Sequence, residues 1–188
     1  MVKYFSSAPF STKSILVDTN VLLWSFYGKY GFTANTYQSS YSNFLATTLS
    51  KGIPVYTTSL NVSEVFHLIE STEFKFYCQN KSLSINSNNR TAELKKYRAD
   101  PVQQILLKNE LNSVYNQITK QIHILSSNVS HKNIFDYINV APNCPDFFDL
   151  AFVQACNDNL ISCILTDDAD FTSFSTMLDI YTNNSKIT

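Results

Sequence analysis

The segment from residue 14 to residue 27 constrains the fold of this chain more than any other. It contains a short apolar run, Ile-Leu-Val at residues 15–17, which is typical of a strand buried on both faces. Asp18 follows at once, and an apolar pattern over residues 21–26 then predicts a helix. This order places Asp18 at the carboxyl end of a parallel strand, where open α/β sheets bind their ligands.

Asp18 itself has two interpretations. As a helix N-cap, its carboxylate would accept a hydrogen bond from a backbone N–H of the following helix. As a functional acid, it would face a ligand at the edge of the sheet. The segment alone does not decide between them.

The composition predicts a globular protein of one domain, or of one domain with an insertion. The chain has 188 residues, of which 44% are hydrophobic and 15% charged. No apolar run approaches the roughly 20 residues of a membrane span. Residues 1–13 have no apolar signal-peptide core, so we expect an extended lead-in and a cytoplasmic protein without membrane association.

The cysteines and glycines exclude several kinds of site. The four cysteines are scattered without a C-x-x-C pair, so we expect reduced, mostly buried thiols and no zinc site (Cys78, Cys144, Cys156 and Cys163). Only three glycines are present, and neither a glycine-rich phosphate loop nor a G-x-S-x-G motif occurs. The net charge of -1 argues against a strongly basic surface, although acids around a metal ion would offset basic residues elsewhere.

Strand-like and helix-like segments alternate from residue 14 to residue 182. This alternation predicts an α/β fold with a central parallel sheet of about five strands, followed by a tail at residues 183–188. The expected strands are residues 15–17, 53–58, 121–125, 160–165 and 178–182. After the helix near residues 21–26, the expected helices are residues 33–51, 101–120, 130–139 and 146–156, and a further helix begins over residues 59–69.

Residues 74–100 interrupt this pattern and are interpreted as an insertion, part helix and part loop. The segment carries aromatic residues near its start and basic residues further on, at Arg90, Lys95, Lys96 and Arg98. Phosphates are bound by Lys and Arg, and unstacked bases by aromatic faces, so the insertion could line a nucleic-acid groove. A solvated helix face is the alternative interpretation.

Acidic residues follow three of the expected strands. Asp18 follows the first strand, Glu64 lies in the helix after the second, and Asp168 follows the fourth. Asp149 begins the helix that leads into the fourth strand. Because the carboxyl ends of parallel strands share one edge, we expect these carboxylates to meet in one crevice.

Like charges at close range raise a carboxyl pKa or recruit a cation, and oxygen ligands favour Mg²⁺ or Mn²⁺. The natural chemistry of such a site is phosphodiester hydrolysis.

The acid set has open alternatives. Asp146 lies one helical turn before Asp149, and Asp170 lies close to Asp168, so either could be a further metal ligand. Asp167 also leaves the last assignment open by a residue or two. The acids at helix starts could equally be caps, and Glu64 could serve the helix dipole. No serine–histidine or cysteine–histidine pair stands at a comparable place, because the histidines lie apart in the sequence (His67, His123 and His131).

Four segments resemble the sequence blocks of PIN-domain nucleases and occur in the family's order. They are Val-Asp18-Thr-Asn20-Val-Leu-Leu, Ser63-Glu64-Val, Asp149-Leu-Ala-Phe-Val-Gln-Ala and Leu-Thr166-Asp-Asp168-Ala-Asp170-Phe171. The resemblance spans about residues 14–182 and implies a three-layer α/β/α fold. It also implies Mg²⁺- or Mn²⁺-dependent cleavage of single-stranded or structured RNA. Many members are toxins of bacterial toxin–antitoxin pairs, so an antitoxin and a second copy of the chain are candidate protein partners.

The resemblance also implies roles for single residues. The family's four acids match Asp18, Glu64, Asp149 and Asp168, and polar positions that orient these acids match Asn20 and Thr166. The insertion after Glu64 is longer than in the compact toxins, which leaves the substrate and the toxin role open.

Three functional hypotheses follow. In the first, the protein is a metal-dependent endoribonuclease in which Asp18, Asp149 and Asp168 hold one or two ions. Glu64 would then bind a second ion or position the attacking water. In the second, it is a non-catalytic RNA-binding or assembly module on the same scaffold. The third, a phosphatase of the haloacid dehalogenase type, requires an Asp-x-Asp pair, and Asn20 replaces its second acid.

Overall fold

The computed structural model of this chain describes residues 1–5, 14–31, 35–126, 135, 139 and 147–187. In this part of the chain, six parallel strands form one sheet in the order β1-β6-β5-β2-β3-β4. The strands are β1 (Val2–Tyr4), β2 (Ile15–Val17), β3 (Val55–Thr58), β4 (His123–Leu125), β5 (Cys163–Leu165) and β6 (Asp179–Thr182). The predicted α/β class with a parallel sheet is therefore confirmed, with six strands in place of about five.

The helices connect these strands in the alternation that the sequence predicts. The described helices are α1 (Thr19–Phe26), α2 (Gly28–Gly31), α3 (Thr36–Ser50), α4 (Ser59–Asn80), α5 (Arg90–Ala99), α6 (Pro101–Gln121), α8 (Phe147–Asp158) and the 3₁₀ helix η1 (Ala169–Phe174). Helices α1, α3, α4 and α6 each follow a residue whose side chain caps the first turn. Asn35 and Gln38 form a capping box at α3, and Asp100 caps α6 just before Pro101.

Strand β2 lies in the interior of the sheet, between β5 and β3, and has helices on both of its faces. Ile15 and Val17 belong to a hydrophobic cluster with residues of α1, α3 and α4, whereas Leu16 belongs to a second cluster with residues of α8 and η1. All three side chains are fully buried. This two-sided burial explains the continuous apolar run at residues 15–17 and gives the expected three layers.

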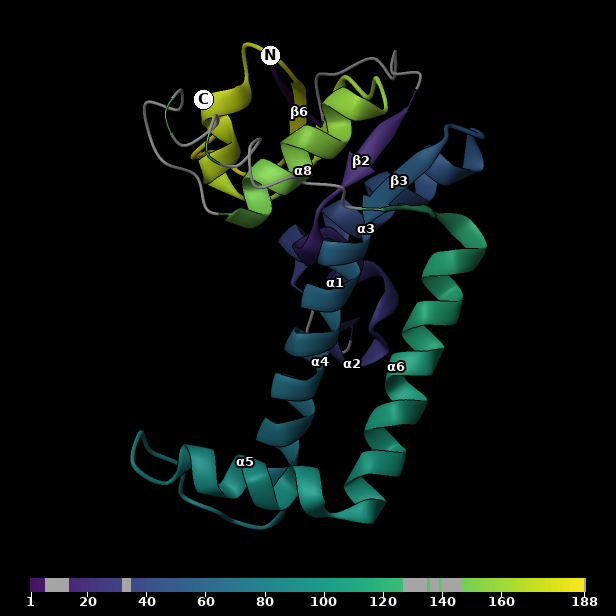
Figure 1. The fold of residues 1–188 in the computed structure, drawn as a ribbon. Coiled ribbons are helices and arrows are strands. Elements are labelled where there is room, and N and C mark those ends of the chain that lie inside the picture. The colour runs from purple at the N-terminus through teal and green to yellow at the C-terminus, as the bar shows by residue number, and fades with distance from the viewer. Residues whose placement is uncertain (6–13, 32–34, 127–134, 136–138, 140–146, 188) are drawn as a thin grey trace.

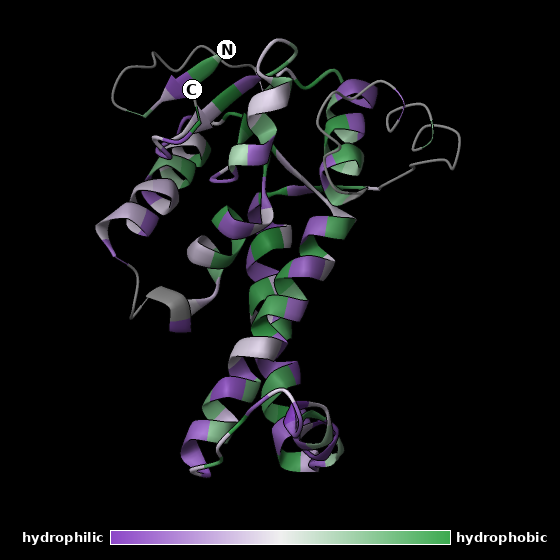
Figure 2. Cartoon of the chain, turned by 90° about the vertical axis from the view of Figure 1, so that its left-hand side faces the viewer, coloured by the Kyte–Doolittle hydropathy of each residue, from purple (hydrophilic) through white to green (hydrophobic). Residues whose placement is uncertain are grey.

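A helical arm, formed by α4, α5 and α6, extends from the sheet (Figure 1). Helices α4 and α6 run side by side in opposite directions, and α5 lies across their far end. Figure 2 shows hydrophobic and hydrophilic residues interspersed along these helices, because each packs with only one face. Tyr97 of α5 packs its ring against Phe74 and Tyr77 of α4, with ring centroids 5.6 and 5.3 Å apart.

The arm contains the segment interpreted as an insertion. Residues 74–100 comprise the last turns of α4, a connecting segment and α5. The helix predicted to begin over residues 59–69 continues to Asn80, and its later turns find a buried partner in α5. The helix expected at residues 130–139 falls largely outside the described residues.

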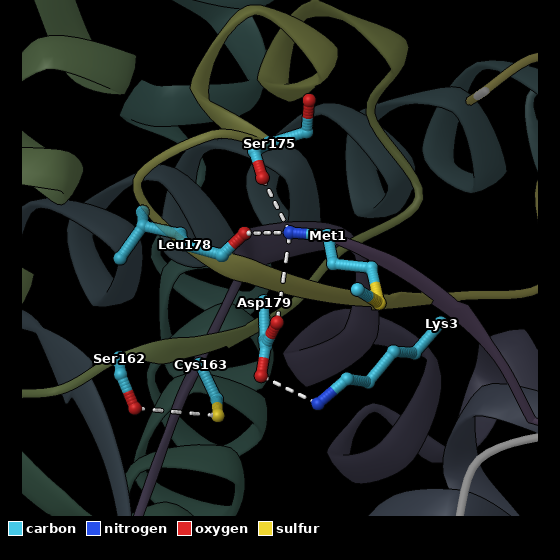
Figure 3. Close-up of polar contacts among 7 residues, drawn as sticks. All are labelled: Met1, Lys3, Ser162, Cys163, Ser175, Leu178 and Asp179. Carbon is cyan, nitrogen blue, oxygen red and sulfur yellow. Dashed lines mark hydrogen bonds and ion pairs between the residues drawn. The ribbon is translucent and has the colours of Figure 1, made fainter.

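Strand β1 forms one edge of the sheet, within the segment expected to be an extended lead-in. It pairs with β6 in parallel register, Val2 opposite Ile180. Lys3 Nζ lies 2.5 Å from Asp179 Oδ2, and the amino group of Met1 donates to the Leu178 carbonyl over 2.9 Å (Figure 3). These contacts, together with the strand pairing, hold Met1 and Lys3 against β6. Within the described residues, no helix has the length and apolar character to cross a membrane.

Candidate active site

Asp18 lies at the carboxyl end of β2 and is only 8% exposed. It is the N-cap of α1, and its Oδ1 accepts a hydrogen bond from the Thr19 backbone N–H over 2.6 Å. Its own backbone N–H donates to the Leu165 carbonyl at the end of β5 over 3.0 Å. The capping interpretation is thus correct, and the carboxylate still lies at the edge where a ligand would bind.

Thr166 connects Asp18 to the turn after β5. The buried Thr166 hydroxyl donates to Asp18 Oδ2 over 2.9 Å and accepts from the Asp168 backbone N–H over 2.9 Å. Asp168 in turn caps η1, where its Oδ1 accepts from the Asp170 backbone N–H over 2.9 Å. One hydroxyl therefore links the carboxylate of Asp18 to the backbone of Asp168.

Glu64 reaches the same place from α4 through a second threonine. Thr19 Oγ1 donates to Glu64 Oε2 over 2.7 Å. Asn61, one helical turn before Glu64, donates from Nδ2 to Thr19 Oγ1 over 3.0 Å and lies 3.4 Å from Asp18 Oδ1. The hydroxyls of Thr19 and Thr166 thus tie the ends of three neighbouring strands, β3, β2 and β5, into one polar network.

Two members of this network, Thr19 and Asn61, are absent from the residues predicted from the sequence. Thr19 is the first residue of α1, and no local sequence signal indicates that its hydroxyl would bridge to Glu64. Asn61 is buried, and its backbone N–H donates to the Thr58 hydroxyl that caps α4 over 3.1 Å. A polar residue at i−3 from a predicted acid on the same helix is the signal that could have identified it.

The electrostatics of Asp18 follow from this placement. Burial raises the pKa of Asp18 from 3.8 to about 7, and the charges of Asp168 and Glu64 add to that rise. Hydrogen bonds from Thr166 and from the Thr19 backbone act in the opposite direction. A carboxylate that is costly to ionise beside two others is the setting in which a bound cation is most favourable.

The other predicted acids are placed differently. Asp167 turns its carboxylate toward α3, where Tyr41 donates to its Oδ1 over 2.7 Å and Tyr37 donates to the same oxygen. Asp170 is exposed. Asp149 lies partly buried in the first turn of α8, and its role as a fourth ligand remains a prediction. Asp146 falls outside the described residues, and Asn20 is a partly buried residue in the first turn of α1.

The basic residues predicted to bind RNA lie on α5, at the far end of the arm from the sheet (Figure 1). Arg98 makes two hydrogen bonds to Glu70, of 2.7 and 2.6 Å, and Lys96 lies 2.6 Å from Glu93. The Arg90 guanidinium lies 6.0 Å from the centre of the Phe74 ring. Lys95 is exposed. Phosphate would therefore compete with carboxylates for two of the four cations.

The donor chemistry at the sheet edge fits a hard divalent cation. Asp18, Glu64 and Asp168 offer carboxylate oxygens, the ligands that Mg²⁺ and Mn²⁺ prefer. As the side chains stand, however, no three His, Cys, Asp or Glu residues in the described part of the chain are arranged to hold a metal ion. Binding would require carboxylates to turn toward a common centre.

Taken together, the fold and the site define an α/β protein with an all-parallel sheet and an acidic cluster at its carboxyl edge. No family model matches the chain, and no curated protein matches it. The fold is similar to a chain in the crystal structure of VapBC2 from Rickettsia felis bound to a DNA fragment from their promoter. That likeness has a TM-score of 0.51 at 11% identity and covers 89% of this chain and 98% of the other. At this identity the comparison shows a shared fold.

Proposed function

We propose that the protein is a metal-dependent endoribonuclease that hydrolyses RNA phosphodiester bonds. The observation that carries the proposal is the polar network at the sheet edge. It gathers Asp18, Glu64 and Asp168 from three neighbouring strand ends. Burial of Asp18 at this place raises its pKa to about 7. The resemblance of the four sequence blocks to PIN-domain nucleases and the similarity of the fold both support it.

In this proposal, Asp18, Asp149 and Asp168 hold Mg²⁺ or Mn²⁺, with Asp146 and Asp170 as further candidate ligands. The bound ion supplies water activation and stabilisation of the charge that develops on the phosphoryl group. Glu64 binds a second ion or positions the attacking water. Thr166 orients the Asp18 carboxylate through its hydroxyl.

The proposal extends to partners. Arg90, Lys95, Lys96 and Arg98 are the candidate RNA-binding residues on the arm. Since many PIN-domain nucleases are toxins, we propose an antitoxin protein as a partner. A second copy of the chain, in a homodimer, is a further candidate partner. The similar fold in a VapBC2 structure bound to promoter DNA supports a toxin–antitoxin role.

The central test replaces Asp18 by Asn, which keeps the N-cap and removes the charge. Asp18→Asn should abolish Mn²⁺-dependent cleavage of RNA while the protein stays folded. Asp158→Asn is the matched control, because Asp158 is an exposed acid at the end of α8, bonded only to Gln154 among the contacts described. Undiminished cleavage by Asp18→Asn would remove the mechanism.

A second candidate, the non-catalytic RNA-binding or assembly module, is favoured by one observation. The described acids are not arranged to hold a metal ion as they stand. Titration of the protein with Mn²⁺ in a calorimeter separates the two candidates. The nuclease proposal requires saturable binding that Asp18→Asn loses, and the module predicts no binding in the millimolar range.

A further inference from the structure

Asp167 lies between two residues of the acidic network, yet its side chain leaves that network. Of its neighbours, Thr166 donates its hydroxyl to Asp18, and Asp168 donates its backbone N–H to that same hydroxyl. The Asp167 carboxylate instead accepts from the phenol hydroxyls of Tyr37 and Tyr41 in α3. The consecutive residues Asp167 and Asp168 therefore have different partners: Asp167 bonds to tyrosines of α3, and Asp168 bonds to Thr166 and caps η1.

The Tyr41 hydroxyl is the centre of this second set of contacts. It lies 3.0 Å from Thr182 Oγ1 at the end of β6 and accepts from the Asn183 backbone N–H over 2.9 Å. Asn184 Nδ2 donates to the Asp167 backbone carbonyl over 2.6 Å. Both the carboxylate and the carbonyl of Asp167 are thus fixed, which leaves the 166–168 turn little freedom to rotate.

The two tyrosine rings are themselves fixed by packing. Tyr41 is fully buried, and its ring meets those of Trp24 and Phe5 edge-on, with centroids 5.3 and 4.9 Å away. Tyr37 meets Tyr41 edge-on at 5.5 Å. Burial raises the pKa of Tyr41 to about 12, so its hydroxyl keeps its proton and remains a donor at neutral pH.

We propose that Tyr37 and Tyr41 are positioning residues of the acidic site. They restrain the Asp167 carboxylate and keep its charge out of the cluster. They thereby hold the 166–168 turn so that the Thr166 hydroxyl donates to Asp18 and accepts from the Asp168 backbone N–H. The inference rests on the proposed function only where metal binding is concerned, because the restraint on the turn stands without it.

The experiment compares the double variant Tyr37→Phe/Tyr41→Phe with Tyr27→Phe. Tyr27 is also buried, and its hydroxyl also donates to a carboxylate, that of Glu73, but on the arm. Amide hydrogen exchange of Asp168 is followed by NMR, and Mn²⁺ affinity by calorimetry. The double variant should exchange this amide about tenfold faster and bind Mn²⁺ several-fold more weakly, as expected for lost hydrogen bonds to a charged group. Tyr27→Phe should change neither quantity.

Equal Asp168 exchange in the double variant and in Tyr27→Phe would overturn the proposal. Should the double variant fail to fold, Tyr37→Phe alone carries the test, since Tyr37 is only partly buried. Asp167→Asn, which retains an acceptor, should keep the amide protected, and Asp167→Ala should not. A wild-type protein that binds no Mn²⁺ would refute the nuclease function, and the exchange of the Asp168 amide would still decide the role of the tyrosines.

Discussion

The Thr166 hydroxyl donates to Asp18 Oδ2 across 2.9 Å, although the two residues are 148 positions apart in the sequence. Both side chains are buried, and the bond joins the carboxyl ends of β2 and β5. Because β2 and β5 pair in the sheet, this bond can form, and it fixes the position of the Asp18 carboxylate in the acidic site.

Replacing Thr166 by Val should destabilise the protein by about 1–3 kcal/mol, because the substitution leaves a buried carboxylate oxygen without its donor. Thr166→Ser keeps the hydroxyl and should cost less. Urea denaturation at pH 8, where Asp18 is mostly ionised, measures both. A Val variant as stable as the Ser variant would show that the hydroxyl contributes nothing to holding Asp18.

The raised pKa of Asp18 predicts how stability depends on pH in the metal-free protein. Asp18 ionises near pH 3.8 when unfolded and near pH 7 when folded, so between these values the folded protein binds the extra proton. The free energy of unfolding should therefore fall as pH rises from about 4 to 7 and level off above that range. The loss attributable to Asp18 is of order 2–4 kcal/mol.

Chemical denaturation of wild type and Asp18→Asn in EDTA, at half-unit steps from pH 5 to 8, checks this expectation. The variant lacks the ionising group and should lose that part of the slope, so it becomes the more stable protein at pH 8. Parallel profiles would mean that Asp18 ionises normally in the folded state.

Mn²⁺ should raise the melting temperature of the wild-type protein, because a ligand that binds only the folded state stabilises it. At a hundredfold excess over the dissociation constant the gain is about 2.7 kcal/mol. Asp18→Asn should show little of this shift, and Asp158→Asn should show all of it. Thermal unfolding followed by circular dichroism gives the comparison, and an equal shift in all three proteins would place any bound Mn²⁺ elsewhere.

Lys29 should be important for the arm. Its Nζ lies 2.6 Å from Glu73 of α4 and 3.0 Å from Glu110 of α6, so a single positive charge pairs with carboxylates from both helices. Lys29→Met should cost about 1–2 kcal/mol, less than a fully buried pair because the lysine is partly exposed. Lys96→Met, which breaks an exposed pair within α5, is the control and should have little effect in the same denaturation experiment.

The sequence predicted the sheet because its strands are buried on both faces and leave a continuous apolar run, as at residues 15–17. It did not predict β1, since three partly exposed residues at a sheet edge show no periodicity. The sequence predicted the start of helix α4 but not its end, because its last turns pack against α5, a partner that the local pattern does not reveal.

The candidate site, like the fold, was predictable only in part from the sequence. Acids after strands share an edge by topology alone, which is how Asp18, Glu64 and Asp168 were singled out. The choice among Asp167, Asp168 and Asp170 depends on Tyr37 and Tyr41, which lie more than a hundred residues away. No local pattern encodes such a pairing, so the restraint on Asp167 appears only in three dimensions.

The interior strand β2 pairs with β3 on one side and with β5, far along the chain, on the other. During synthesis, the ribosome must therefore extend the chain as far as Leu165 before β2 gains its second neighbour. Until then Asp18 has neither Thr166 nor Asp168 beside it. A nascent or truncated chain would carry the first acid without its partners, so any activity of this site must appear late, together with the completed sheet.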